Sequence, residues 1–234
     1  MTALLFRDDP YLRDAMATVT AHTPEGAVVL DRSLFYPTGH GQPGDSGALD
    51  WPGGRLGIAT TVASGPRDLA LVPAEAAALP PVGAHVRQRL DWARRHRHMR
   101  VHTALHLLSV TVALPVTGAA VDRAGGRVDF DVSGTESHPF PDPAALSERL
   151  NRLIAQDLVV RETWAADAAP DLCGARGGRP PVRMIEIGAG QGRVDLQACG
   201  GTHVARSSEI GRVRIGRIED RGLGTRRVHL YLDD

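Results

Sequence analysis

The fold is organised around residues 97–108, which read Arg97-His98-Met99-Arg100-Val101-His102-Thr103-Ala104-Leu105-His106-Leu107-Leu108. His102 and His106 stand four positions apart, so on a helix both side chains lie on one face, with their Cβ atoms roughly 6 Å apart. Two imidazoles at that distance can bind one metal ion. The stretch therefore predicts a helix that carries half of a metal site.

The other half is predicted in residues 199–203, Cys199-Gly200-Gly201-Thr202-His203. A thiolate and a third imidazole stand here with the same four-residue offset. The two glycines between them permit a tight backbone that points both side chains one way. One cysteine with three histidines is typical of a zinc site. We therefore expect zinc as the cofactor, with four ligands: His102, His106, Cys199 and His203.

The spacing also disfavours two common kinds of zinc protein. The two pairs are far apart in the chain, unlike the short local spacings of a zinc finger. No Glu follows His102, so the helix lacks the general base of the H-E-x-x-H metallopeptidases. The predicted ion instead joins two distant elements of the fold.

The composition is that of a globular protein, with 234 residues of which 42% are hydrophobic. The 27 basic residues, all arginine, balance 27 acidic residues, so net charge gives no argument for a nucleic-acid partner. No apolar run approaches the roughly 18 residues that span a membrane, and residues 1–10 carry charges where a signal peptide is apolar. We expect a cytoplasmic protein without membrane association. In that compartment a metal at Cys199 is favoured over a disulfide with Cys173.

Residues 18–62 show short β-type runs broken by Gly and Pro, residues 34–36 among them, and they predict a small antiparallel sheet or barrel. Between two runs lies a Gly-rich loop, residues 36–47. It is interpreted either as an exposed multi-turn loop or as backbone that approaches a ligand closely. Residues 65–83, rich in Pro and Ala, predict a connector with a short helix. The first domain is thus expected to be β-barrel-like and to cover residues 1–88.

The second domain, residues 89–234, is expected to begin with the histidine-bearing helix, from an N-cap at Asp91 to about Ala113. The start of this helix is rich in arginine, which predicts either a solvated face or a phosphate-binding surface. In the second case the binding residues are Arg94, Arg95, Arg97 and Arg100.

Later segments complete an α+β domain, with helices on one face of a mainly antiparallel sheet. The predicted elements are a strand at residues 127–132, a helix that starts at Asp142-Pro143, a strand at 182–187, and a hairpin of residues 213–218 and 228–232. The fold class is therefore α+β, with a small N-terminal β-barrel domain followed by an α+β zinc-binding domain.

Together these motifs resemble the AlaX-type free-standing alanyl-tRNA editing proteins, which are related to the editing domain of alanyl-tRNA synthetase. The resemblance rests on the Gly-rich segment 35–47, on residues 102–108 and on residues 199–204. Because the Gly-rich segment is present, the chain is similar to the longer, two-domain form of the family. One residue departs from the pattern: His40 stands where Gly is usual, which leaves the backbone conformation of the loop open.

The resemblance implies an N-terminal domain like the β-barrels of translation proteins and a second domain like the editing domain of threonyl- and alanyl-tRNA synthetases. It implies zinc on the four ligands and a trans-editing deacylase that hydrolyses the ester of tRNA(Ala) mischarged with serine or glycine. The arginine-rich helix start then becomes a tRNA-binding surface. Gln42 would help to position the substrate, and Thr103 and Thr117 are candidates to bind the serine hydroxyl.

Two other functions are compatible with the residues alone. A structural-zinc RNA-binding protein would unfold without zinc, and a metal-dependent hydrolase of another small ester or amide would act without tRNA. The sequence is compatible with both a monomer and a homodimer.

Overall fold

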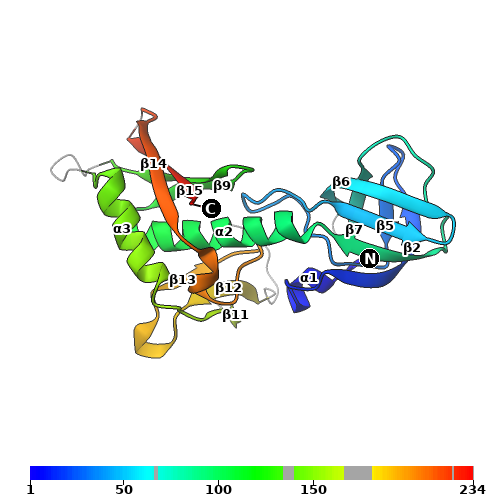
Figure 1. The fold of residues 1–234 in the computed structure, drawn as a ribbon, viewed down its shortest axis with the longest axis horizontal. Helices are drawn as coiled ribbons and strands as arrows, with labels where there is room; N and C mark the ends of the chain where they lie inside the picture. Colours follow the sequence, from blue (N-terminus) through cyan, green and yellow to red (C-terminus); the bar gives the residue numbers. More distant parts are fainter. Residues whose placement is uncertain (66–67, 134–139, 166–180, 223, 234) are drawn as a thin grey trace, which may run out of the picture. The chain divides into compact units, whose positions relative to one another are not determined.

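The computed structural model describes residues 1–65, 68–133, 140–165, 181–222 and 224–233, and it contains two compact units, Met1–Met99 and Arg100–Asp234. The elements along the chain (Figure 1) are β1 (Ala3–Leu4), α1 (Leu5–Asp8), β2 (Asp14–His22), β3 (Val28–Leu30), β4 (Arg32–Ser33), β5 (Gly47–Trp51), β6 (Gly54–Ser64), β7 (Asp68–Pro73), β8 (His85–Leu90), α2 (Trp92–Val112), β9 (Val116–Val121), β10 (Gly125–Asp131), α3 (Pro143–Ile154), β11 (Val160–Ala165), β12 (Val182–Ile187), η1 (Gly190–Gly192), β13 (Asp195–Ala198), η2 (Ser207–Ile210), β14 (Val213–Asp220) and β15 (Thr225–Leu232).

The first unit contains a closed barrel with the strand order β2-β3-β7-β6-β5-β8. Neighbouring strands of the barrel are antiparallel all the way round. Apolar side chains on the inner faces of the strands form one buried core, which includes Leu30, Leu49, Leu56, Leu71 and Val86. The predicted barrel is confirmed.

The segment at residues 34–36, predicted as a strand, is irregular and buried. Its amides are satisfied by side chains: the Leu34 N–H donates to Gln88 Oε1 at 3.1 Å, and the Tyr36 N–H donates to Asp45 Oδ2 at 2.6 Å. The apolar residues are buried as a strand's would be, but their amides bond to buried polar side chains and not to a neighbouring strand. The strand prediction for these residues is therefore wrong.

Residues 68–73 form the barrel strand β7, where the sequence predicts a connector with a short helix. Leu69, Ala70 and Leu71 are buried in the barrel unit. The strand pairs with β3 and β6, so its conformation comes from partners that lie elsewhere in the chain and not from local propensity. Residues 74–83 contain no helix.

The Gly-rich loop contains a tight turn with backbone bonds on both sides. Gly39 and Gln42 exchange N–H···O bonds of 3.0 and 2.9 Å across it. The two residues between them, His40 and Gly41, have φ angles of 49° and 72°, the signs of a type I′ turn. His40 thus occupies a left-handed conformation that a glycine adopts without strain.

Helix α2 begins and ends where the sequence predicts. Asp91 Oδ1 accepts a hydrogen bond from the Arg94 N–H at 3.2 Å, which caps the first turn. The helix stops at Val112, before Ala113 with its φ of 58°. From residue 100 onward its apolar side chains are buried on several faces, so this half of the helix lies inside the second unit.

The second half of α2 packs between two sheets of its unit (Figure 1). On β10, a Cβ added at Gly126 would lie 2.9 Å from Val101 Cγ1 and 3.0 Å from Leu105 Cδ1, so the glycine permits the close approach of strand and helix. On β13, Asp195 Oδ2 lies 2.8 Å from His106 Nδ1. The helix is therefore held on both sides, and one of its faces meets β13.

Both sheets of the second unit are antiparallel, with strand orders β14-β15-β10-β9 and β11-β12-β13. Helix α3 starts at the predicted cap, where Asp142 Oδ1 accepts from the amides of Ala144 and Ala145. Asn151 of α3 donates to the Val213 carbonyl of β14 at 2.8 Å. The α+β class is confirmed. Within the described ranges, no helix has the length and apolarity needed to cross a bilayer.

Candidate metal centre

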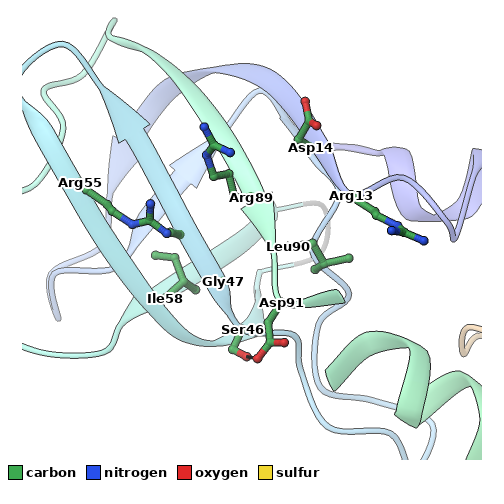
Figure 2. Close-up of a pocket in the computed structure, with 10 residues that line it drawn as sticks. Arg13, Asp14, Ser46, Gly47, Arg55, Ile58, Arg89, Leu90 and Asp91 are labelled. Carbon is green, nitrogen blue, oxygen red and sulfur yellow. Dashed lines mark hydrogen bonds between the residues drawn. The ribbon is translucent and has the colours of Figure 1, made fainter. Parts of the chain in front are cut away.

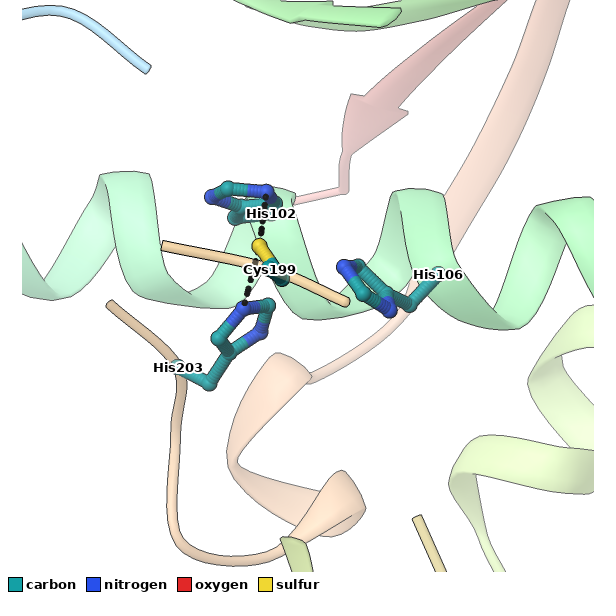
Figure 3. A group of neighbouring side chains, drawn as sticks. All are labelled: His102, His106, Cys199 and His203. Carbon is teal, nitrogen blue, oxygen red and sulfur yellow. Dashed lines mark hydrogen bonds between the residues drawn. The ribbon is translucent and has the colours of Figure 1, made fainter. Parts of the chain in front are cut away.

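Four side chains from two distant segments converge in the second unit, as Figure 3 shows, and we call them the metal cluster: His102, His106, Cys199 and His203. The histidines of α2 project from one face of the helix, and the other two residues follow β13. One possible ligand atom from each residue lies within 4.8 Å of the others. Cys199 Sγ is 3.5 Å from His102 Nε2 and 3.4 Å from His203 Nε2. The four donors can hold a metal ion.

The turn that presents Cys199 is fixed by bonds to its backbone. The Gly201 N–H donates to Cys199 Sγ at 3.4 Å, so the two-glycine turn curls around the sulfur. Arg183 Nη1 donates to the carbonyls of Cys199 and Gly201 at 2.8 and 2.9 Å. Arg183 is therefore an anchor of this turn, and the role of the glycine pair stays a prediction.

The cluster favours a thiolate beside a protonated imidazole. Burial disfavours the charged thiolate, but hydrogen bonds with the three histidines outweigh it and lower the pKa of Cys199 to about 2. Burial also disfavours a charge on His106, yet its hydrogen bonds with Asp195 and Cys199 raise its pKa to about 9. Burial, helped by the nearby charge of His102, lowers the pKa of His203 to about 3. A metal ion that binds here displaces the proton of His106.

Two residues outside the cluster hold its histidines in place. Thr103 Oγ1 lies 3.1 Å from His203 Nδ1, and Asp195 Oδ2 lies 2.8 Å from His106 Nδ1. Both histidines are therefore engaged through Nδ1, away from the sulfur. Asp195 is absent from the predicted site residues, although alternation along β13 gives a signal: residues 195, 197 and 199 lie on one face of the extended chain.

Comparison with known proteins identifies the family of the chain. The family model described as "Threonyl and Alanyl tRNA synthetase second additional domain" matches residues 182–229, which include the last two cluster residues. The alanyl-tRNA editing protein AlaX-M of Methanosarcina acetivorans is 30% identical over 249 residues that cover all of both chains, and that of Methanosarcina barkeri is 30% identical over 247. The chain belongs to the alanyl-tRNA editing protein family.

The family predicted from the motifs is thereby confirmed. The alanine–tRNA ligase of Pyrobaculum neutrophilum is 33% identical over 230 residues, which are 93% of this chain and 25% of the ligase. The chain thus spans about a quarter of the length of the ligases it matches. The match to the editing proteins, by contrast, extends from end to end.

The three residues predicted to contact the substrate lie in different environments. Thr103 is fully buried and bonded to His203, and its Oγ1 also accepts from the Val204 N–H at 3.3 Å. Thr117 is exposed on β9, and its hydroxyl donates to the Asp129 carbonyl at 3.3 Å. Gln42 is buried in the first unit, next to the turn of the Gly-rich loop. Their catalytic roles stay predictions.

Cys173 lies outside the described residues. Cys199 is a buried free cysteine in the part of the chain that the structure describes.

The structure corrects the prediction for Arg95 as a phosphate-binding residue. Its side chain is fully buried, and its guanidinium pairs with the carboxylate of Asp45. A guanidinium without exposed surface cannot contact a phosphate of a bound nucleic acid. Arg95 is therefore part of the core of the first unit.

The other three predicted arginines are partly exposed. Arg94 donates to the Gly44 carbonyl at 3.3 Å, and Arg100 donates to the Ile210 carbonyl at 2.9 Å. Both side chains are thus partly engaged within the protein. As tRNA contacts, they and Arg97 stay predictions.

A hollow of about 630 Å³ lies on the barrel, at the open ends of β5 and β8 (Figure 2). Three arginines line it, Arg13, Arg55 and Arg89. Arg55 and Arg89 both pair with Asp50, and Arg13 lies over the ring of Trp92 at 4.4 Å. Arg55 and Arg89 thus share the single carboxylate of Asp50. The residues that line the hollow include none of the predicted phosphate-binding residues.

Proposed function

We propose that this protein is a zinc-dependent deacylase that hydrolyses the ester bond of tRNA(Ala) mischarged with serine or glycine. The observation that carries the proposal is the convergence of three imidazoles and one thiolate in a chain that matches alanyl-tRNA editing proteins over their full length. The family supports the substrate class, and the cluster supports the chemistry.

The donor set and its spacing support zinc as the metal. Zinc prefers nitrogen and sulfur ligands, at about 2.0–2.1 Å and about 2.3 Å, and in a tetrahedral site such ligands lie about 3.6 Å from each other. The two Sγ···Nε2 distances in the cluster, 3.5 and 3.4 Å, are close to this edge length. The pKa of Cys199, lowered to about 2, also favours the thiolate that zinc requires.

When bound, zinc supplies Lewis acidity to the ester carbonyl and to water. The protein's own residues hold the donors in place: Asp195 fixes His106, and Thr103 fixes His203. A hydroxyl is a weaker partner for an imidazole than a carboxylate is. We therefore assign the looser attachment within the cluster to His203.

There is a physical reason why mischarged tRNA is hydrolysed at a second site, separate from the synthetase pocket that charges it. A synthetase pocket that is built for the methyl group of alanine discriminates only weakly against side chains that differ by one small group. Selectivity against correctly charged Ala-tRNA then has to come from polar groups that remain unpaired when the serine hydroxyl is absent. Thr103 and Thr117 are the candidates to bind the serine hydroxyl, and Gln42 is the candidate to position the substrate. Arg94, Arg97 and Arg100 are the candidates for contact with the tRNA backbone.

The test is hydrolysis of Ser-tRNA(Ala), Gly-tRNA(Ala) and Ala-tRNA(Ala) by the purified, zinc-loaded protein. We expect release of serine or glycine while Ala-tRNA(Ala) is spared. The variant Cys199→Ala should lose this activity, and the variant Arg87→Gln, which removes an exposed arginine of the barrel, should keep it.

Two outcomes would replace the proposal by the alternatives that the sequence leaves open. Absence of hydrolysis with zinc still bound, together with loss of fold on chelation, would favour a structural-zinc RNA-binding protein. Equal hydrolysis of small esters or amides with and without tRNA would favour a metal-dependent hydrolase of a different substrate.

A further inference from the structure

A buried carboxylate lies directly behind one histidine of the metal cluster. Asp195 is 5% exposed, and its Oδ2 lies 2.8 Å from His106 Nδ1. A carboxylate accepts hydrogen bonds and does not donate them, so this contact requires the proton on Nδ1. Nε2, the ring nitrogen that does not face Asp195, is then the atom with which His106 can bind a metal once its proton has left.

The carboxylate is itself held in a closed ring of hydrogen bonds. Gln197 Nε2 donates to Asp195 Oδ1 at 2.7 Å and to Ser109 Oγ at 2.8 Å. Ser109 Oγ in turn donates to the main-chain carbonyl of His106 at 2.7 Å. The ring thus runs from His106 through Asp195, Gln197 and Ser109 back to His106, and it ties β13 to α2.

This arrangement differs from that at His203. His203 meets a hydroxyl at 3.1 Å, and a hydroxyl can either donate or accept, so the contact leaves the tautomer of His203 undefined. The carboxylate contact at His106 defines the tautomer, and the two bonds to Gln197 and His106 fix the carboxylate on both oxygens.

We propose that Asp195 is the positioning residue of the metal centre: acting through His106, it fixes the tautomer and the ring orientation with which this ligand meets the metal. Gln197 and Ser109 support Asp195 in that role. The inference rests on the proposed metal centre and adds to it the residues that hold His106 in place.

The test measures zinc affinity by competition with a chelator, which needs no substrate. Because residues that orient a metal-binding histidine typically contribute 10–100-fold to metal affinity, Asp195→Asn should weaken zinc binding by about that factor. Gln197→Leu, which leaves Asp195 in place but removes its support, should weaken it by a smaller factor. Glu186→Gln is the matched control, because Glu186 is a buried carboxylate on the adjacent strand that pairs with Arg161 instead.

A double-mutant cycle separates positioning from general damage to the fold. In a His106→Ala background, Asp195→Asn should have no further effect on zinc affinity, because the residue through which it acts is absent. If Asp195 only supported the fold, the two losses would add. Circular dichroism of each variant confirms that the compared proteins are folded.

Three results would overturn the proposal. They are an unchanged zinc affinity in folded Asp195→Asn, an equal loss in Glu186→Gln, and additive losses in the cycle. A wild-type protein that binds no zinc would overturn the proposed metal centre together with this inference. A wild-type protein that binds zinc, with any of the first three results, would overturn the inference alone.

Discussion

The residues of helix α2 take part in two buried groups of charged side chains, and the two are built in opposite ways. In the first unit, the guanidinium of Arg95 donates to the Asp45 carboxylate and to the carbonyls of Pro10 and Leu34. Every partner is an atom of the protein. In the second unit, the metal cluster directs three imidazoles and a thiolate at one another, and its donors converge on a shared point.

The difference separates a structural group from a functional one. A buried cation that meets a carboxylate and two carbonyls has its partners within the protein, and its role is to fix the elements it joins. Lone pairs that converge on one point need a cation between them. In the metal-free protein, the proton of His106 meets part of that need. Burial and charge alone therefore do not identify a site; the question is whether the protein itself supplies the partner.

The largest effect on the free energy of unfolding is expected for the Arg95 group, in which the protein supplies both the cation and the carboxylate. Arg95→Met leaves the Asp45 carboxylate buried without its cation, and removal of one partner of a buried pair costs about 3–5 kcal/mol. The free energy of unfolding, measured by urea titration with tryptophan fluorescence, should fall by that amount.

Two further variants check this reading of Arg95. Arg87→Gln breaks an exposed ion pair with Asp14 and should cost less than about 1 kcal/mol. The double variant Arg95→Met, Asp45→Leu should recover part of the loss, because no charge is then left unpaired. An Arg95→Met protein that is as stable as Arg87→Gln would contradict the structural role.

The sequence predicts the metal cluster but not the Arg95 group, and the reason is physical. Histidines at a four-residue offset, and a Cys-Gly-Gly-Thr-His turn, are local patterns with a direct chemical meaning. The partner of Arg95 stands fifty positions earlier in a loop, so nothing near Arg95 distinguishes it from the arginines that surround it. The sequence around Arg95 then favours a surface position, and the prediction of Arg95 as a phosphate-binding residue fails.

The same distinction explains the errors in the barrel. The cap of α2 at Asp91 and the cap of α3 at Asp142 are local signals, and both are correct. Strand β7 is defined by pairing with β3 and β6, and its sequence neighbours, rich in Pro and Ala, favour a connector. Local sequence patterns carry no information about pairing with distant strands, so they do not predict β7.

Removal of the metal is expected to have a smaller effect on the free energy of unfolding. The metal-free cluster holds a thiolate beside a protonated His106, so its charges are partly compensated, and the chelated protein should keep its far-UV circular dichroism. Zinc at 100 times its dissociation constant should add about 2.7 kcal/mol to the free energy of unfolding. Cys199→Ala should lose this zinc-dependent increment. Unfolding on chelation would contradict the compensation and would place the metal among the structural elements.

The smallest effect concerns His98, a buried histidine of α2 that belongs to neither group. It is 2% exposed, and its Nδ1 has no hydrogen-bond partner among the described residues. Burial, together with the charges of Arg94, Arg95 and Arg97, lowers the pKa of His98 from 6.5 to about 4, against the opposing charge of Asp91. The folded protein therefore keeps this imidazole neutral where the unfolded chain protonates it.

The sign of the pH dependence follows from that difference. The contribution of His98 is fully present above pH 6.5 and is lost as the pH falls from 6.5 towards 4, because only the unfolded chain gains a proton there. Between pH 7 and 5.5 the loss should be about 1 kcal/mol. His98→Leu should remove this part of the slope in chelated protein, whereas His85→Gln, at an exposed histidine of the barrel, should retain it. Equal slopes in wild type and His98→Leu would mean that the imidazole is charged in the folded state, and then α2 would hold a third buried charge whose partner would have to be found.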